Sequence, residues 1–389
     1  MSLVVSLPDE TGRPVAYRMR AAPIAVPTGP HRFNRVAFSA AHVVADPFAG
    51  REPTVGPAID WEKTLGFRRR LLDLGLGIAE AMDTAQRGTG LDWPGALELI
   101  SRSLAAAAPP ERERIFSGVG TDQLAPDDTT TIDDVVRAYS EQIEAVQALG
   151  GRLIIMASRA LARVAGNAED YRAVYRHVLS LCDKPVILHW LGDMFDPALK
   201  GYWGAATFSS TLETALAVIE ENAAKVDGIK ISLLDAKKEI IMRRRLPAGM
   251  KMYTGDDFSY AELIKGDAQG HSHALLGIFD PIAAAASAAL SALARNDVAT
   301  FESLMEPTVP LSRLIFRAPT QHYKTGVVFL AYLNGYQDHF VMLGGAQSMR
   351  PLPYFTGVFR LADEAGLLSD PGLAAARMRR FLALYGFEA

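Results

Sequence analysis

The sequence predicts a (β/α)8 TIM barrel with an N-terminal hairpin extension and a C-terminal helical segment. Short apolar runs alternate with amphipathic stretches, and eight such pairs span about 250 residues, the element count of this fold. Apolar residues make up 49% of the 389 residues, so the chain can bury a large core. A doubly wound open sheet is the alternative. It often carries a glycine-rich phosphate loop after its first strand, and none follows residues 35–44.

Residues 1–30 predict the hairpin extension. Two short runs with apolar residues, 4–7 and 15–19, flank residues 8–12, where proline, acidic residues and glycine are typical of a turn.

The barrel is expected over residues 31–295 and the helical segment over 296–389. The strands are expected at 35–44, 77–84, 114–120, 152–158, 184–191, 228–234, 250–255 and 271–278. The helices between and after them are expected at about 60–74, 94–107, 130–149, 168–182, 211–224, 235–245, 258–265 and 281–294. Beyond residue 295 the pattern is helical, at about 296–305, 310–317, 323–341, 356–366 and 371–384, with prolines between the helices.

Composition excludes several classes of partner. The formal net charge is -4 and the pI is about 6.1, which favour neither nucleic acid nor an anionic membrane as partner. Cys182 is the single cysteine, so no disulfide can form within the chain. No basic region followed by an apolar stretch opens the sequence, and its apolar runs are too short to span a bilayer. We therefore expect a cytoplasmic protein.

Lys230 is the most informative residue. It lies in the apolar run 226–234, and alternation along a strand places Ile229 and Ile231 on one face and Lys230 with Ser232 on the other. A buried ammonium either pairs with a carboxylate or loses its proton, and a neutral amine attacks carbonyl groups. The sequence therefore leaves two interpretations open, a structural ion pair and an imine-forming nucleophile.

Barrel enzymes carry their sites at the C-terminal ends of the strands, so polar residues there are candidates. In strand order they are His42 and Asp46; Asp83, Thr84 and Gln86; Thr121 and Asp122; Ser158 and Arg159; His189, Trp190 and Asp193; Lys230 and Ser232; Tyr253, Asp256 and Asp257; His271 and His273.

Several of these candidates have a structural interpretation beside the functional one. His189 is either a proton-transfer group or a hydrogen-bonded core histidine. Asp256 fits a turn that caps the next helix as well as a substrate contact. Asp83 indicates either a ligand nearby or a buried ion pair. His271 and His273 fit a phosphate-facing turn, a metal pair or a polar barrel rim.

The segment Asp227-Gly228-Ile229-Lys230, followed by Tyr253-Thr254-Gly255-Asp256-Asp257, resembles the dihydrodipicolinate synthase / N-acetylneuraminate lyase superfamily, which has a G-I-K strand and an S-G-D-D turn. The stretch KPVIL at 184–188 is similar to its P-V-I-L-Y strand, and Val119-Gly120 ends a strand as its G-V-G does. The resemblance covers roughly residues 35–370 and is to a divergent branch of the domain-of-unknown-function type.

The resemblance implies class I aldolase chemistry, with Lys230 forming an imine with a small carbonyl substrate. Such an imine needs no external cofactor, and we assign no metal ligands. The resemblance also implies a homodimer or homotetramer.

The sequence departs from the superfamily at two places. The G-T-T-G-E loop that holds a substrate carboxylate falls on residues 82–86, where only Thr84 matches. The proton-relay tyrosine falls on about residues 158–159, where no tyrosine stands. Proton transfer is therefore expected from His189 or Tyr253. The expected substrate-binding residues are Thr84, Asp83, Arg159, Asp256 and His271.

These observations predict a Schiff-base-forming lyase or aldolase, or a dehydratase, acting on a 2-keto acid or a sugar-derived carbonyl compound. One alternative is a barrel enzyme that uses a divalent metal bound among His42, Asp83, His189, Asp256, His271 and His273. The other is a non-catalytic barrel that binds a metabolite.

Overall fold

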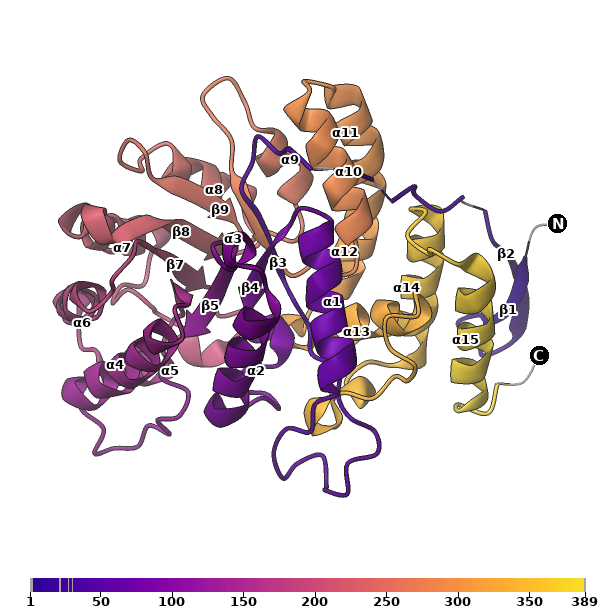
Figure 1. Cartoon of the computed structure of the whole chain (residues 1–389), viewed down its shortest axis with the longest axis horizontal. Helices are drawn as coiled ribbons and strands as arrows, with labels where there is room; N and C mark the ends of the chain where they lie inside the picture. The colour runs from indigo at the N-terminus through magenta and orange to yellow at the C-terminus, as the bar shows by residue number, and fades with distance from the viewer. Residues whose placement is uncertain (1–2, 21, 27, 30, 388–389) are drawn as a thin grey trace. The chain divides into compact units, whose positions relative to one another are not determined.

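The computed structural model describes residues 3–20, 22–26, 28–29 and 31–387. The chain divides into two compact units (Figure 1). The barrel unit comprises Arg35–Ala41 and Gly77–Leu276, and the helical unit comprises Met1–Asn34, His42–Leu76 and Gly277–Ala389. The domain boundaries expected at residues 30 and 295 stay a prediction.

Eight parallel strands close the barrel unit in the order β10-β3-β4-β5-β6-β7-β8-β9. They are β3 (Ala37–Ala40), β4 (Gly77–Glu80), β5 (Ile115–Val119), β6 (Arg152–Ile155), β7 (Val186–Leu191), β8 (Val226–Ser232), β9 (Lys251–Thr254) and β10 (His273–Leu276). The unit's helices are α2 (Trp93–Ala106), α3 (Pro109–Arg112), α4 (Ile132–Ala148), α5 (Arg159–Val164), α6 (Ala168–Ser180), α7 (Phe208–Glu221), α8 (Ala236–Arg243) and α9 (Tyr260–Lys265), with the 3-10 turns η1 (Asp83–Ala85), η2 (Pro197–Leu199) and η3 (Ala223–Lys225). The predicted (β/α)8 fold class is confirmed.

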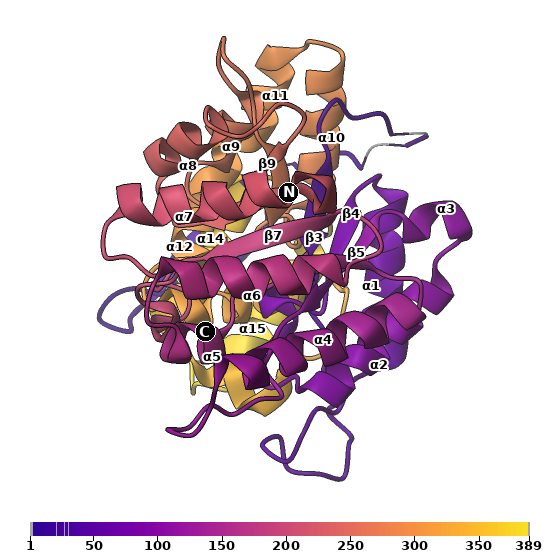
Figure 2. The same cartoon turned by 90° about the vertical axis from the view of Figure 1, so that its left-hand side faces the viewer.

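Most helices of the barrel unit begin at a residue whose side chain accepts a hydrogen bond from the first turn. Thr131 caps α4 and forms a reciprocal pair of hydrogen bonds with Asp134, and Asn167 caps α6 in the same way with Asp170. Figure 2 shows α6 alongside β7, between α4 and α7. Each capped helix thus starts at a fixed point after its strand, which also fixes the loop between them.

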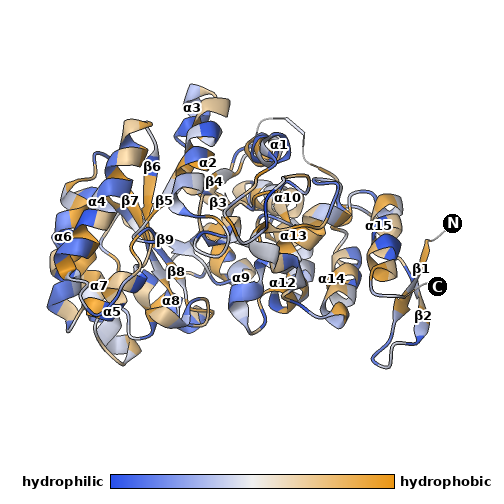
Figure 3. Cartoon of the chain, turned by 90° about the horizontal axis from the view of Figure 1, so that it is seen from below, coloured by the Kyte–Doolittle hydropathy of each residue, from blue (hydrophilic) through white to orange (hydrophobic). Residues whose placement is uncertain are grey.

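The barrel interior is filled by apolar side chains from seven of the eight strands or from the turns that follow them. The cluster consists of Phe38, Ala40, Ala79, Met82, Phe116, Ile154, Ile187, Tyr253 and Leu275, with Met156 packed against it. Figure 3 shows β6 and β7 as hydrophobic and the neighbouring α4 and α6 with hydrophilic stretches. Only the inside of a closed barrel brings side chains of so many strands together.

Most strands end earlier than the sequence predicts. β4 stops at Glu80, four residues before the expected end, because Ala81 adopts a left-handed backbone with φ 52°. Asp83 and Thr84 therefore lie in the turn η1 and not in the strand.

The helical unit contains the predicted hairpin, in which β1 (Val4–Pro8) pairs antiparallel with β2 (Pro14–Arg18). Its helices are α1 (Trp61–Asp73), α10 (Ala283–Ala294), α11 (Val298–Met305), α12 (Val309–Ile315), α13 (Lys324–Leu333), α14 (Leu352–Glu364) and α15 (Pro371–Ala383), with the 3-10 turns η4 (Glu306–Thr308), η5 (Thr320–His322) and η6 (Leu343–Ser348). The Tyr17 hydroxyl of β2 donates a 2.8 Å hydrogen bond to Asp363 of α14, which ties the hairpin to the helices. Within the described ranges, no helix has both the length and the apolar character to cross a membrane.

Candidate active site

Lys230 lies in the middle of β8 and points into the barrel. It is in register with His189 of β7 and with Tyr253 of β9, and paired residues of parallel strands share a face. Tyr253 belongs to the interior cluster, so Lys230 faces the interior as well. Only 8% of Lys230 is exposed. The alternation seen in the sequence thus places the amine on the inner face.

Glycine beside Lys230 leaves room for its long side chain. A Cβ atom on Gly255 would lie 2.7 Å from Cε of Lys230, which is closer than real contacts allow. Because Gly255 directly follows β9, the end of the lysine side chain passes the C-terminal end of that strand. Asp256 and Asp257 come next in the chain.

The Lys230 amine makes neither a hydrogen bond nor an ion pair with any other described residue. Burial lowers its pKa to about 8, and the negative charges of Asp257 and Asp83 oppose that shift. A larger share of the amine is therefore neutral at pH 7 than for an exposed lysine. The sequence left open that Lys230 forms a structural ion pair with a carboxylate. No such pair forms among the described residues.

His189 stands next to Lys230 on the neighbouring strand. Its Nε2 lies 3.2 Å from Oγ of Ser232, which also points inward from β8. Burial holds the pKa of His189 well below its usual range, and the charge of Lys230 lowers it further. The imidazole is therefore neutral at physiological pH.

Thr84 and Asp83 lie in η1, beyond the end of β4. Thr84 is buried, with 1% exposed, while Asp83 is half-buried and acts electrostatically on Lys230. Asp256 is also buried, and its Oδ1 accepts hydrogen bonds from the backbone amides of Phe258 and Ser259 at 2.8 and 3.0 Å. These bonds form a turn before α9, but Asp256 does not cap that helix, because its N-cap residue is Ser259, which makes no side-chain cap hydrogen bond.

Arg159 begins α5, after β6, and its Nε donates a 2.5 Å hydrogen bond to Asp196 in the loop after β7. The guanidinium lies near the β4 loop as well, since a Cβ on Gly88 would be 3.7 Å from its Nη1. The loop after β7 is held by Trp203, which is fully buried and contacts the ring of Tyr175 at 4.9 Å. Arg159 thus has a carboxylate partner on an anchored loop.

Three candidate residues do not lie at the C-terminal ends of the strands, where the sequence analysis expects them. The Tyr253 hydroxyl donates a 2.6 Å hydrogen bond to Asp227, the second residue of β8, so it points toward the N-terminal ends of the strands. Burial and the charge of Asp227 raise its pKa. His271 precedes β10 and is exposed, so its expected position at the C-terminal end of that strand is wrong. The same holds for His273, the first residue of β10. His271 is the first residue of the predicted strand 271–278, so the sequence pattern itself places it at the N-terminal end of that strand.

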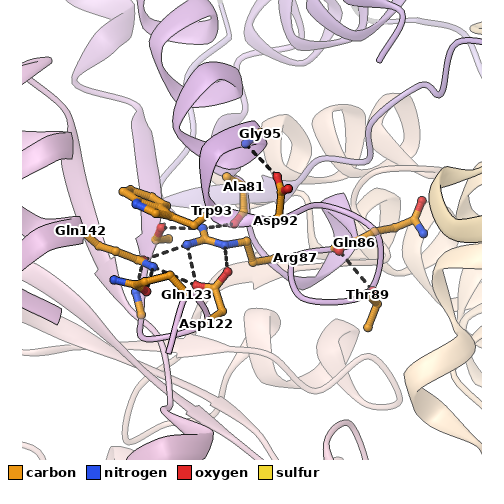
Figure 4. A network of polar contacts seen from close by, with 12 residues as sticks. Ala81, Gln86, Arg87, Thr89, Asp92, Trp93, Gly95, Asp122, Gln123 and Gln142 are labelled. Atoms are coloured by element: carbon orange, nitrogen blue, oxygen red, sulfur yellow. Dashed lines mark hydrogen bonds and ion pairs between the residues drawn. The ribbon is translucent and has the colours of Figure 1, made fainter. Parts of the chain in front are cut away.

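Arg87 organises the strand ends and was not predicted as a site residue. Its guanidinium is buried and donates two hydrogen bonds to Asp122, at 2.7 and 2.8 Å, and one to Gln142 (Figure 4). It also donates to the carbonyl oxygens of Ala81 and Gly118, both at 3.1 Å. Burial raises the pKa of Asp122, but the bonds and charge of Arg87 outweigh that effect and keep it low. The network holds the turn that carries Asp83 against the loop after β5.

His42, expected at the end of the first strand, lies in the helical unit. Its Nδ1 is 2.7 Å from Oδ2 of Asp280, and both side chains are fully buried. Within the described residues, no group of three or more histidine, cysteine, aspartate or glutamate side chains is arranged to hold a metal ion. The six side chains considered for a metal site therefore do not form such a group.

Comparisons with known proteins agree with this fold. A family model described as "Protein of unknown function (DUF993)" matches residues 5–387. The prophage protein YagE from E. coli K12, of the dihydrodipicolinic acid synthase family and solved with pyruvate, superposes with a TM-score of 0.67 at 13% identity, covering 86% of this chain and 99% of that one. Dihydrodipicolinate synthase from Thermotoga maritima superposes with a TM-score of 0.64 at 13% identity, and the match covers 87% of this chain and 100% of that one. Dihydrodipicolinate synthase from Acinetobacter baumannii, solved with pyruvate, superposes with a TM-score of 0.61 at 16% identity, and the match covers 86% of this chain and 99% of that one. No curated protein matches the chain.

Proposed function

We propose that this chain, which belongs to the DUF993 family and has the fold of the dihydrodipicolinate synthases, is a Schiff-base-forming lyase, aldolase or dehydratase. One observation carries the proposal. Lys230 presents an amine to the interior of the barrel, with its pKa lowered to about 8 and with no ion pair among the described residues. An amine in that state attacks ketones and aldehydes.

The chemistry would begin with addition of the neutral Lys230 amine to the substrate carbonyl, followed by loss of one water molecule to form the imine. In a lyase or aldolase, a base takes the proton of the hydroxyl on the β-carbon, the bond between the α- and β-carbons breaks, and its electrons move to the protonated imine to give an enamine, while an aldehyde leaves. Protonation of the enamine at the α-carbon restores the imine. In a dehydratase, a base takes the α-proton to give the enamine, which expels the protonated β-hydroxyl as water and leaves an unsaturated imine. In both cases hydrolysis of the imine releases the product and restores the amine.

His189 is the proposed proton-transfer group. Its neutral imidazole lies in register with Lys230 on the adjacent strand, within reach of the same substrate atoms. Tyr253 is the weaker candidate, because its hydroxyl is already bonded to Asp227. We further propose that Thr84, Asp83, Asp256 and Arg159 contact the substrate's polar groups, and that the protein works in the cytoplasm as a homodimer or homotetramer.

Borohydride trapping tests the proposal. Sodium borohydride reduces an imine to a stable secondary amine, so incubation with the right carbonyl compound should add the mass of one reduced ligand per chain. Peptide mapping should place the adduct on Lys230, and Lys230→Met should abolish it. Lys251→Met is the matched control, since Lys251 lies on the next strand but is paired with Asp227 at 2.7 Å, and its adduct yield should equal that of the wild type.

A panel of keto acids, ketoses and aldehydes that gives no adduct on Lys230 would contradict an imine-forming enzyme. A non-catalytic barrel predicts a different result for Lys230→Met. Removal of a buried amine with no role should then only increase the free energy of unfolding.

A further inference from the structure

A cavity inside the helical unit lies between the last turn of α1 and the first turn of α10. Its polar lining consists of Arg70 of α1, Asp280 just before α10, Tyr336 and Ser369. We propose that this cavity binds a small oxyanion that carries a proton, of the hydrogen phosphate or bicarbonate type. The site is separate from Lys230, and the inference does not depend on imine formation.

The size of the cavity restricts the ligand to a few atoms. The part of it that is wide enough for water corresponds to about two or three water molecules. The side chains of Ile24, Val26 and Leu367 form an apolar part of its wall. A nucleotide or a sugar is too large for that space, whereas a single phosphate or carbonate ion is comparable to it.

The start of α10 favours a negative charge in the cavity. This helix begins without a side-chain cap and without an acidic residue in its first turn. Ala283, Ala284 and Ala285 form that turn and line the cavity, and none of them donates its backbone amide to a described residue. Amides at the N-terminus of a helix, together with the helix dipole, attract anions.

Arg70 adds a positive charge. It makes no ion pair within the part of the chain that the structure describes, and its buried Nε has no hydrogen-bond partner there. The guanidinium carbon lies 4.5 Å from the centroid of the Tyr336 ring, which holds the group at the cavity. A guanidinium group in that state can bind an oxyanion by charge-assisted hydrogen bonds.

Asp280 determines which oxyanion fits. Its Oδ2 accepts a 2.8 Å hydrogen bond from the backbone amide of His42 and lies 2.7 Å from Nδ1 of the same residue. Its Oδ1 is buried and has no partner among residues 3–20, 22–26, 28–29 and 31–387. An ionised carboxylate only accepts hydrogen bonds, so it can bind an O–H group and repels an anion that has none. Arg70 and the start of α10 in turn disfavour a cation.

Isothermal titration calorimetry of the full-length protein tests the site with three anions. Sodium phosphate, sodium bicarbonate and sodium sulfate are titrated separately at neutral pH and equal ionic strength. Sulfate has the same charge and shape as phosphate but no proton to donate to Asp280. We expect phosphate or bicarbonate to bind at least roughly tenfold more tightly than sulfate, since a hydrogen bond to a charged group contributes that factor or more. The tighter of the two identifies the ligand.

Two variants test the residues that carry the inference. Arg70→Met should remove binding of the preferred anion, because it removes the positive charge. Arg69→Met is the matched control, since the neighbouring Arg69 is paired with Asp73 at 2.9 Å and does not line the cavity, and its affinity should equal that of the wild type. Asp280→Asn replaces a carboxylate with an amide that can donate a hydrogen bond, so it should reduce the preference over sulfate. If Asp280→Asn fails to fold, the selectivity of the wild type and the loss in Arg70→Met still decide.

Three results would overturn the inference. Sulfate that binds as tightly as both other anions would contradict the role of Asp280. Binding that survives Arg70→Met would place the ion elsewhere on the protein. Absence of binding with all three anions would mean that the cavity takes up only water. None of these results bears on the imine function of Lys230.

Discussion

Lys230 illustrates what one residue can and cannot reveal in a sequence. Its position in an apolar run at strand spacing predicts an inward-facing amine, and the register with His189 and Tyr253 agrees. The sequence does not show whether a carboxylate reaches that amine, because this depends on turns far away in the chain. Asp83 and Asp257 come close enough to act on it but do not pair with it.

A second buried ionisable residue, Glu239 of α8, leads to a prediction on pH and stability. Ser272 donates a 2.7 Å hydrogen bond to its Oε1, and burial raises its pKa from 4.5 to about 8. The folded protein thus holds a proton that the unfolded chain releases at lower pH. The contribution to stability is complete below about pH 4.5 and is lost as the pH rises toward 8, at roughly 1.4 kcal/mol per pH unit.

Glu239→Gln removes this titration while keeping the shape of the side chain. The free energy of unfolding of the wild type should therefore fall relative to the variant between about pH 4.5 and 8, as measured by urea denaturation at several pH values. Glu144→Gln, at an exposed position on α4, is the control: its free energy of unfolding should change with pH in the same way as that of the wild type. Parallel curves for Glu239→Gln would show that the glutamate is not buried as described.

At the scale of elements, the alternation of strands and helices was predictable, and the strand ends were not. Apolar spacing fixes which face is buried, but the end of β4 depends on the left-handed backbone of Ala81. The start of β10 at His273 depends on pairing with β3 and β9, which local apolar character does not reveal. The expectation that His271 lies at a C-terminal strand end was wrong, because His271 opens the predicted strand 271–278. Arg87 escaped prediction because its partners, Asp122 and Gln142, lie 35 and 55 residues away in sequence.

The Arg87 network yields a prediction for the turn that carries Asp83. Removal of one partner from a buried, hydrogen-bonded ion pair leaves the other unpaired, which costs about 3–5 kcal/mol. Arg87→Ala should lower the free energy of unfolding by about that amount, as measured by chemical denaturation. Arg102→Ala breaks an exposed pair with Glu98 on α2 and should cost less than about 1 kcal/mol. A loss of similar size in both variants would refute a structural role for the network.

At the scale of the whole molecule, barrel closure could be predicted from the count of strands, whereas the division into two units could not. The helical unit draws on three separate stretches of sequence. Inside it, Phe67 of α1 contacts the ring of Tyr336 at 5.5 Å, and Lys63 of α1 pairs with Asp338 at 3.0 Å. Such contacts between distant segments leave no local signature in the sequence.

This organisation predicts the outcome of a truncation. A chain ending at residue 295 keeps α1 and α10 but loses α11 to α15, so it exposes apolar side chains such as Phe67, which is 3% exposed in the full chain. We expect this fragment to bind the dye ANS and to lack a cooperative thermal transition by circular dichroism, unlike the full chain. Cooperative unfolding of the fragment would support a boundary at residue 295 instead.

The aromatic filling of the barrel has one more consequence. Tyr253, with its hydroxyl bonded to Asp227, and the rings of Phe38 and Phe116 occupy the interior toward the amino ends of the strands. We therefore expect a substrate to reach the Lys230 amine from the opposite, C-terminal side of the barrel. Under the proposed chemistry, the water expelled when an imine forms must leave by the route through which the substrate arrives. Substrate entry and water release would then use the same route and could not occur at the same time.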